Sequence, residues 1–131
     1  MRVLLIEDDS ATAQSIELML KSESFNVYTT DLGEEGVDLG KLYDYDIILL
    51  DLNLPDASGI DILKRVKENR YLKTTPVVVL TTSIEPSDVD RAYALGANSY
   101  IQKPVEFDRF VEVVRQIGRY WLGINLPPRR C

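Results

Sequence analysis

The chain has 131 residues, of which 45% are hydrophobic, and this length and composition suit one folded domain with its own core. Its 21 acidic and 15 basic residues give a net charge of -6, which argues against a uniform nucleic-acid-binding surface. There is no histidine, so histidine-based catalysis and histidine metal ligands are excluded.

Five short apolar runs predict β-strands. The third and fourth runs are continuous rather than alternating, as expected for strands that are buried on both faces. In chain order the five runs are Val3–Ile6, Phe25–Tyr28, Ile47–Leu50, Val77–Leu80 and Ser99–Ile101.

Segments with helical spacing follow the strands. Ser10 can cap the first helix, and a weaker helical segment runs from about Gly33 to Lys41. Pro86 suits the first turn of a fourth helix, which Gly96 would end. The apolar residues expected on the inner faces are Ala13, Ile16, Met19 and Leu20 in the first helix, Ile62, Leu63 and Val66 in the third, Val89, Ala92 and Tyr93 in the fourth, and Phe107, Phe110, Val111, Val114 and Ile117 in the fifth.

Strand and helix alternate five times, which predicts an α/β fold with a parallel sheet covered on both faces. We expect residues 1–121 to form this domain and residues 122–131 to form a C-terminal tail, with no residues left for a second domain. The single cysteine, Cys131, permits no internal disulfide, which fits a reducing, cytoplasmic location. No apolar run approaches the roughly 20 residues of a membrane-spanning helix, so no membrane contact is expected.

Acidic residues follow two of the predicted strands. Glu7, Asp8 and Asp9 follow the first strand, and Asp51 follows the third. If these strands are neighbours, Asp8 and Asp51 lie close together, and a cation would relieve their repulsion. Oxygen ligands in the absence of histidine favour Mg²⁺ over zinc. Taken singly, such acids more often cap helices or face solvent, and we interpret Asp9 as a helix-start residue.

Four segments together resemble the signatures of response-regulator receiver domains, the CheY-like fold of two-component signalling. They are "LLIEDD", "LLDLNLPDASG", "VVVLTTS" and "YIQKP", and the resemblance extends from Arg2 to about Trp121. It implies a doubly wound, five-stranded parallel (βα)5 sheet in the order 2-1-3-4-5, with two helices on one face and three on the other.

The resemblance also assigns roles to the acidic residues and to a lysine. It implies that Asp51 is the phospho-acceptor and that Asp8 is a direct Mg²⁺ ligand. Glu7 would act through water or by shaping the acidic pocket, and Asn53 would offer its backbone carbonyl to the metal. Lys103 would pair with a phosphoryl oxygen.

Further roles fall on the ends of the fourth and fifth strands. Thr81 resembles the switch hydroxyl, and the backbone N–H of Thr82 would contact the phosphoryl group. Tyr100 matches the aromatic switch position, although a half-buried strand aromatic is an almost equal interpretation. Relatives typically have a cis peptide at the position of Lys103–Pro104, which an X–Pro bond permits at modest cost.

The resemblance implies a phospho-accepting signalling protein rather than a turnover enzyme. A histidine kinase or phosphotransfer protein would transfer a phosphoryl group to Asp51 with Mg²⁺ bound, and the domain would also phosphorylate and dephosphorylate itself. The surface of the fourth helix, fifth strand and fifth helix would then change its partner preference. No direct DNA contact is expected. Tyr120, Trp121 and Leu122 would support a homodimer or pack over the fifth helix.

Three alternatives remain open from the sequence. A flavodoxin-class binding module shares the topology, but acids occupy its phosphate-loop position. A receiver-like scaffold would act by docking or dimerising without accepting phosphate. Finally, residues 1 to about 60 resemble CtrA-type receivers of winged-helix transcription factors, whereas the chain from about Leu63 resembles stand-alone, phytochrome-associated receivers. A natural mosaic or an engineered chimera without a native role would produce this pattern.

Overall fold

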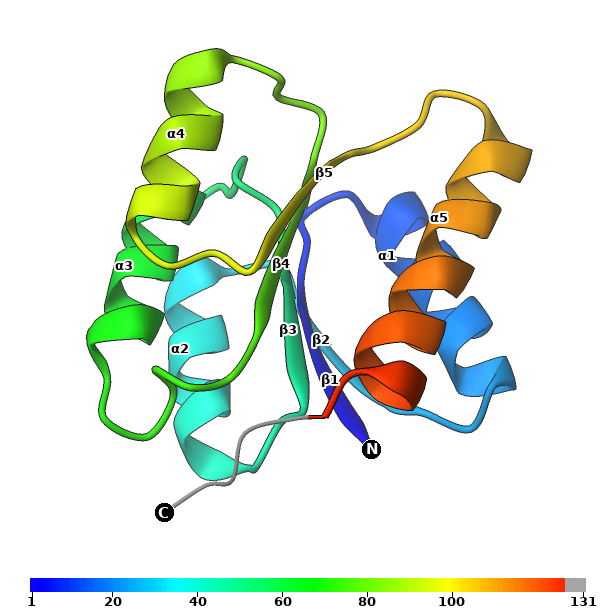
Figure 1. The fold of residues 1–131 in the computed structure, drawn as a ribbon, viewed down its shortest axis with the longest axis horizontal. Helices are drawn as coiled ribbons and strands as arrows, with labels where there is room; N and C mark the ends of the chain where they lie inside the picture. The colour runs from blue at the N-terminus through cyan, green and yellow to red at the C-terminus, as the bar shows by residue number, and fades with distance from the viewer. Residues whose placement is uncertain (127–131) are drawn as a thin grey trace.

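The computed structural model describes residues 1–126, so Cys131 and the Pro127-Pro128 pair lie outside the described residues. Strands and helices alternate along the whole of the described chain (Figure 1). Their bounds are β1 Arg2–Ile6, α1 Ser10–Ser22, β2 Asn26–Thr30, α2 Gly33–Leu42, β3 Ile47–Leu50, α3 Gly59–Glu68, β4 Val77–Thr81, α4 Pro86–Ala94, β5 Ser99–Gln102, α5 Phe107–Arg119 and a closing π-helical turn Tyr120–Ile124.

The strands form one parallel sheet in the order β2-β1-β3-β4-β5, which confirms the predicted topology. Helices α1 and α5 cover one face, and α2, α3 and α4 cover the other (Figure 1). The chain reverses its direction of progress across the sheet after β2, because β3 pairs with the opposite edge of β1. At such a switch point the loops after β1 and β3 diverge and leave room for a functional site at the carboxyl edge.

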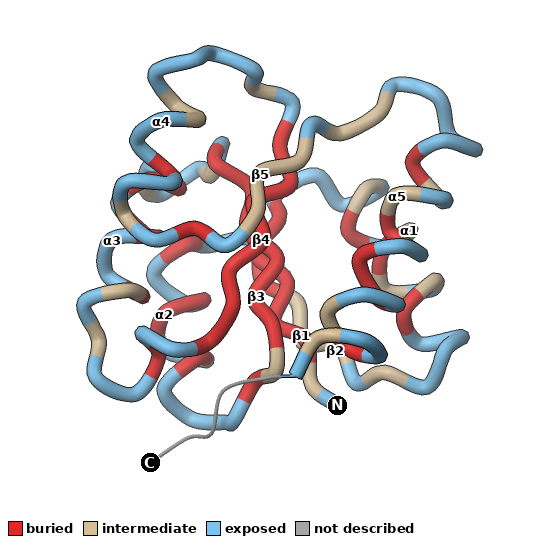
Figure 2. Tube along the Cα trace, viewed as in Figure 1, coloured by how far each residue is buried: buried red, intermediate tan, exposed pale blue. Residues whose placement is uncertain are grey.

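The central strands are buried on both faces, which explains why their sequences are continuous apolar runs. All four residues of β3 are buried, as are all five of β4 (Figure 2). Alternate residues enter two cores: Ile48 and Leu50 face α2 and α3, whereas Ile47 and Leu49 face α1 and α5. Each fully buried Leu or Ile contributes roughly 1.5–3 kcal/mol relative to an exposed one.

Three predictions about the helices are wrong. Asp9, rather than Ser10, caps α1, since its carboxylate accepts a hydrogen bond from Thr12 N at 3.1 Å. In α4 only Ala92 is fully buried and Tyr93 is 49% exposed, because this short helix presents a narrow stripe to the sheet. Phe107, in the first turn of α5, is 65% exposed because it lies on the wall of an open pocket beside α1.

The end of α5 packs back onto the domain. Trp121 lies against the core shared with α1, and Leu122 is only 6% exposed. Tyr120 stays half exposed and meets the Trp121 ring edge-on at 5.1 Å between centroids. Packing over α5 is therefore observed, whereas the homodimer stays a prediction.

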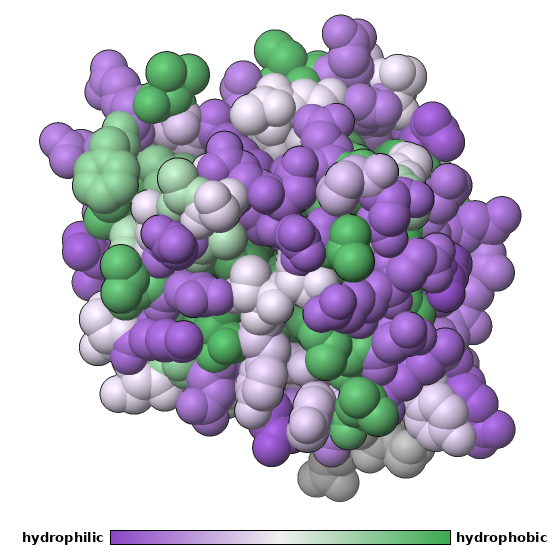
Figure 3. Space-filling view, turned by 180° about the vertical axis from the view of Figure 1, so that it is seen from behind, coloured by the Kyte–Doolittle hydropathy of each residue, from purple (hydrophilic) through white to green (hydrophobic). Residues whose placement is uncertain are grey.

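The face of the molecule opposite to the view of Figure 1 is mostly hydrophilic. Seen from behind, apolar side chains appear singly or in small groups among polar ones (Figure 3). Within residues 1–126, none of the helices combines the length and apolar character needed to cross a bilayer.

Candidate functional site

Acidic side chains meet at the carboxyl ends of β1 and β3, as the sequence predicted. The two strands are paired, and the backbone N–H of Asp51 donates to the Ile6 carbonyl at 3.0 Å. This pairing brings carboxylate oxygens of Glu7, Asp8 and Asp51 within 4.8 Å of one another. Glu7 and Asp51 are 2% and 4% exposed, whereas Asp8 faces solvent, so the cluster is buried beneath and open above.

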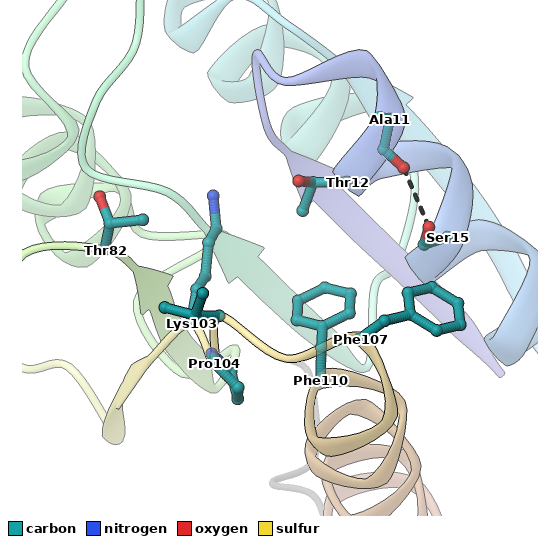
Figure 4. A pocket seen from close by; sticks show the side chains of 9 residues that line it. Ala11, Thr12, Ser15, Thr82, Lys103, Pro104, Phe107 and Phe110 are labelled. Atoms are coloured by element: carbon teal, nitrogen blue, oxygen red, sulfur yellow. Dashed lines mark hydrogen bonds between the residues drawn. The ribbon is translucent and has the colours of Figure 1, made fainter.

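Lys103 directly follows the edge strand β5, and its side chain extends toward this cluster. Its Nζ lies 2.8 Å from Glu7 and 3.2 Å from Asp51, and its side chain is 10% exposed. The backbone N–H of Lys103 donates to the Thr81 carbonyl at 2.7 Å, which extends the β4–β5 pairing beyond the strands. Figure 4 shows the lysine side chain reaching between Thr82 and Thr12.

The charges in the site do not balance. Burial is the main cause that raises the pKa of Glu7 to about 7; the hydrogen bond from Lys103 opposes this increase, and the neighbouring Asp51 carboxylate adds a smaller increase. Burial lowers the pKa of Lys103, but its bonds to Glu7 and Asp51 outweigh this and hold the pKa above its ordinary value. Three carboxylates facing one ammonium group leave an excess negative charge. An all-oxygen cluster of this kind suits a hard divalent cation.

The loop from β3 to α3 folds back over Asp51. The backbone N–H of Asn53 donates to Asp51 Oδ1 at 3.3 Å, while the Asn53 side chain is exposed. Gly59 N donates to the Leu52 carbonyl at 2.9 Å, and a Cβ on Gly59 would lie only 2.4 Å from the Leu52 Cα. Gly59 is therefore required by the close approach of two backbones. This loop and Asp8 line an open pocket of about 610 Å³.

Hydroxyl groups lie at the end of β4. Thr81 is fully buried, and Thr82 is exposed beside Lys103. The half-buried Tyr100 donates its hydroxyl to the Ser83 carbonyl at 2.9 Å. The Ser83 hydroxyl in turn bonds to Asp88 of α4 at 2.7 Å. A continuous polar connection thus leads from the loop beside the site to β5 and α4.

The Lys103–Pro104 peptide differs from what the resemblance implied. Peptide bonds in the described residues are all trans, including this one. The two isomers of an X–Pro bond differ by only about 0.5–1 kcal/mol, so sequence alone does not dictate the choice. Beyond Pro104 lies a second pocket of about 330 Å³ between α1 and α5, with Phe107 and Phe110 on one wall (Figure 4).

Two polar residues of this region were missed by the sequence reasoning. Asp88 lies in the first turn of α4, and Asp56 lies in the loop after β3, where it binds the start of α2. One feature of the sequence points toward a role like that of Asp56: helix α2 is preceded by Leu32, whose apolar side chain cannot cap the helix. A helix without its own cap needs an acceptor from elsewhere in the fold.

Residues 3–115 match the family model described as response regulator receiver domain. The match covers most of the chain, and the chain therefore belongs to this family. Receiver domains are the phosphorylatable components of two-component systems, and response regulators take their phosphoryl groups from histidine kinases. The family is one of signalling modules rather than of classical enzymes.

Curated relatives include cell-cycle regulators. The chain is 59% identical over 119 residues to the cell cycle transcriptional regulator CtrA of Caulobacter vibrioides, which covers 91% of this chain and 51% of that protein. The cell cycle response regulator CtrA of Brucella ovis is also 59% identical, covering 91% and 50%. The chain thus spans about half the length of these relatives. The alignment extends past Leu63, across the junction expected for a mosaic, so a chimeric origin stays a prediction.

Solved structures with the same fold include two response regulators of close shape. The Mn²⁺-bound form of response regulator Rcp1 has a TM-score of 0.91 and 31% identity, covering 98% of this chain and 99% of that one. The phosphorylated cyanobacterial phytochrome response regulator RcpA has a TM-score of 0.91 and 32% identity, covering 98% of each chain.

Proposed function

We propose that Asp51 accepts a phosphoryl group from a protein phosphohistidine, with Mg²⁺ bound beside it. The observation that carries this proposal is the placement of the Asp51 carboxylate. It lies at a strand end, within 4.8 Å of Glu7 and Asp8 oxygens and 3.2 Å from Lys103 Nζ. A carboxylate is a competent nucleophile toward phosphorus when its neighbours neutralise the charge that gathers there.

The transfer is a displacement at phosphorus. A carboxylate oxygen of Asp51 forms the new P–O bond, and the P–N bond to the donor imidazole breaks. The electron pair of that bond stays on the imidazole nitrogen, which takes up a proton. The product is an acyl phosphate, and later attack by water on its phosphorus returns Asp51 as a carboxylate.

The residues around Asp51 fit a divalent cation, since three carboxylates converge there with a single ammonium group. Asp8 and Asp51 would hold the ion directly, together with the Asn53 carbonyl, and Glu7 would bind through water or shape the pocket. When bound, Mg²⁺ supplies positive charge to the phosphoryl oxygens. Mg²⁺ also keeps several water ligands, which suits the solvent-facing side where Asp8 lies.

Lys103, Thr81 and Thr82 would stabilise the phosphorylated form. Lys103 already contacts Asp51, so a small movement transfers its hydrogen bond to a new phosphoryl oxygen. Thr81 would donate its hydroxyl to the same group, and Thr82 its backbone N–H. These contacts exist only after transfer and therefore favour the phosphorylated conformation.

The switch surface would be α4, β5 and α5. The Tyr100 hydroxyl donates to the Ser83 carbonyl at 2.9 Å. Movement of the β4–α4 loop toward the phosphoryl group would therefore shift the position of this carbonyl. Tyr100 would turn further inward as this loop closes, and the exposed surface would change for a downstream protein. We place the chain in the cytoplasm, where histidine kinases draw phosphoryl groups from ATP.

Intact-mass spectrometry after incubation with acetyl phosphate tests the proposal. We expect the mass of one phosphoryl group to be added with Mg²⁺ present and none in excess chelator. Asp51→Asn should abolish the gain, because an amide oxygen is a poor nucleophile and forms no stable acyl phosphate. Asp38→Asn, an exposed change in α2, is the matched control and should behave as the wild type.

The alternative of a docking scaffold has a distinct outcome. A folded wild-type chain that gains no mass from acetyl phosphate or from a phosphorylated phosphotransfer protein would contradict the proposal. A gain that persists in Asp51→Asn would contradict the assignment of Asp51.

A further inference from the structure

Asp56 connects the loop after Asp51 to a different helix. Its Oδ1 accepts from Gly33 N at 2.8 Å and its Oδ2 accepts from Glu34 N at 3.0 Å. These two donors are the first backbone N–H groups of α2, 23 and 22 residues away along the chain. The bonds from Glu34 and Gly33 also hold the pKa of Asp56 below its ordinary value, so the group stays ionised.

Helix α2 depends on this carboxylate for its first turn. The residue at its N-cap position, Leu32, makes no side-chain capping bond. A Cβ on Gly33 would lie 2.7 Å from Ile62 and 3.2 Å from the Leu54 side chain, so the helix start packs tightly on α3 and on the loop itself. The loop and the start of α2 are therefore joined by the packing of Leu54 against Gly33 and by the two hydrogen bonds that the Asp56 carboxylate accepts.

The same loop carries the backbone carbonyl expected to bind the cation. That carbonyl belongs to Asn53, in the peptide unit that joins it to Leu54. On one side the Asn53 N–H donates to Asp51 Oδ1 at 3.3 Å. On the other side Pro55 restricts Leu54 to extended conformations. Asp56 then follows directly and attaches this stiff segment to α2, in addition to the bridge between Asn53 and Ser58 and the Gly59 N–H bond to the Leu52 carbonyl within the loop.

We infer that Asp56 is a positioning residue that holds the Asn53 carbonyl in the orientation needed for divalent-cation binding, using α2 as its anchor. The inference rests on the proposed function, since it concerns the same cation site. Asp56 touches neither the phosphoryl group nor the cation. It acts through the loop, in the way that groups behind metal ligands commonly set the ligand's orientation.

Isothermal titration calorimetry with MgCl₂ on the whole chain measures this role directly. We expect Asp56→Ala to raise the Kd for Mg²⁺ by about 10-fold, the lower end of the range for groups that orient metal ligands. At saturating Mg²⁺, phosphorylation of Asp51 by acetyl phosphate should recover to near the wild-type rate. Loss of positioning thus affects the Mg²⁺ concentration needed and not the chemical step.

Two further variants separate geometry from charge. Asp56→Asn removes the charge but keeps one carbonyl acceptor, and it should bring the Kd back to within about 3-fold of wild type. Glu35→Gln removes an exposed charge from the same first turn of α2 and should leave the Kd unchanged. Circular dichroism of each variant verifies that it is folded at the temperature of the titration.

Each other result overturns the inference. Asp56→Ala with a wild-type Kd and a lower midpoint of urea unfolding would make Asp56 a helix cap only. Equal weakening in Asp56→Ala, Asp56→Asn and Glu35→Gln would make the effect one of net charge. If the wild type binds Mg²⁺ and is phosphorylated, and Asp56→Ala has the same Kd for Mg²⁺, the inference alone is refuted. If the wild type neither binds Mg²⁺ nor is phosphorylated, the proposed function is refuted as well.

Discussion

At the scale of single residues, the most unusual group is Glu7. It is a carboxylic acid at 2% exposure whose pKa is raised to about 7, first because it is buried and second because Asp51 lies beside it. Among the described residues, Lys103 is the only cation that forms a salt bridge with Glu7, and Lys103 also pairs with Asp51. Near neutral pH without a divalent cation, Glu7 is therefore partly protonated.

This shift predicts how stability depends on pH. Between the ordinary value of 4.5 and about 7, the folded state holds a proton on Glu7 that the unfolded state has lost. The contribution of Glu7 is fully present below this window and is lost as pH rises through it. In metal-free buffer we expect the free energy of unfolding of wild type, relative to Glu7→Gln, to fall by on the order of 1–3 kcal/mol from about pH 5 to about pH 7.

Urea unfolding of both proteins across this range makes the measurement. Glu7→Gln is the suitable reference because it keeps the size of the side chain and one oxygen acceptor and does not titrate. Parallel pH profiles for the two proteins would contradict the raised pKa of Glu7.

At the scale of elements, the start of α1 distinguishes two neighbouring residues. Asp9 accepts from Thr12 N at 3.1 Å, whereas Ser10 is the first helical residue. We expect Asp9→Ala to lower the free energy of unfolding by about 1 kcal/mol, because it removes both a cap and a negative charge near the helix N-terminus. Ser10→Ala should change it by less than about 0.5 kcal/mol. Urea unfolding decides between them, and equal losses would restore Ser10 as a contributor to the cap.

The elements also show where sequence patterns were sufficient. The predicted strand Ile47–Leu50 has the same bounds as β3 in the structure. A strand that is buried on both faces is apolar at every position, so its ends are marked by the first polar residue on each side. Pro86 begins α4, and Gly96 takes a φ of +105° just after it, as predicted for a stop. The inward face of α4 was predicted less well. Tyr93 fits the helical spacing, but it is largely exposed, and Ala92 is the fully buried residue of α4.

At the scale of the whole molecule, cation binding should be coupled to folding. The acidic cluster joins β1 to β3, so it exists only in the folded chain. At about 100 times its Kd, Mg²⁺ should raise the free energy of unfolding by about 2.7 kcal/mol. The gain should disappear in Asp8→Asn, which removes a predicted direct ligand, and persist in Asp38→Asn. Urea unfolding at matched ionic strength makes the comparison, and an equal gain in all three proteins would indicate a general salt effect.

Much of the candidate site was accessible from the sequence. Strand ends in a parallel sheet share one edge, so Asp8, Asp51, Thr81 and Lys103 were expected to converge, and the structure places Lys103 between Glu7 and Asp51. Asp56 lies within the motif "LLDLNLPDASG", but the resemblance assigns it no role. Its partners are amides of α2 more than 20 residues earlier; the uncapped start of α2 indicates that an acceptor is needed but does not identify Asp56 as that acceptor.

The family, the order of the elements along the chain and the residues that gather at the carboxyl edge could all be predicted from the amino-acid sequence. The family follows from the resemblance of four short motifs to receiver domains, whereas apolar periodicity predicts the strands and helices, and the right-handed crossover rule limits how they assemble. Four features required the folded structure: the acid that caps α1, the trans Lys103–Pro104 bond, the raised pKa of Glu7 and the attachment of Asp56 to α2. Each of these depends on burial or on a partner distant in the chain, which periodicity along one segment cannot encode.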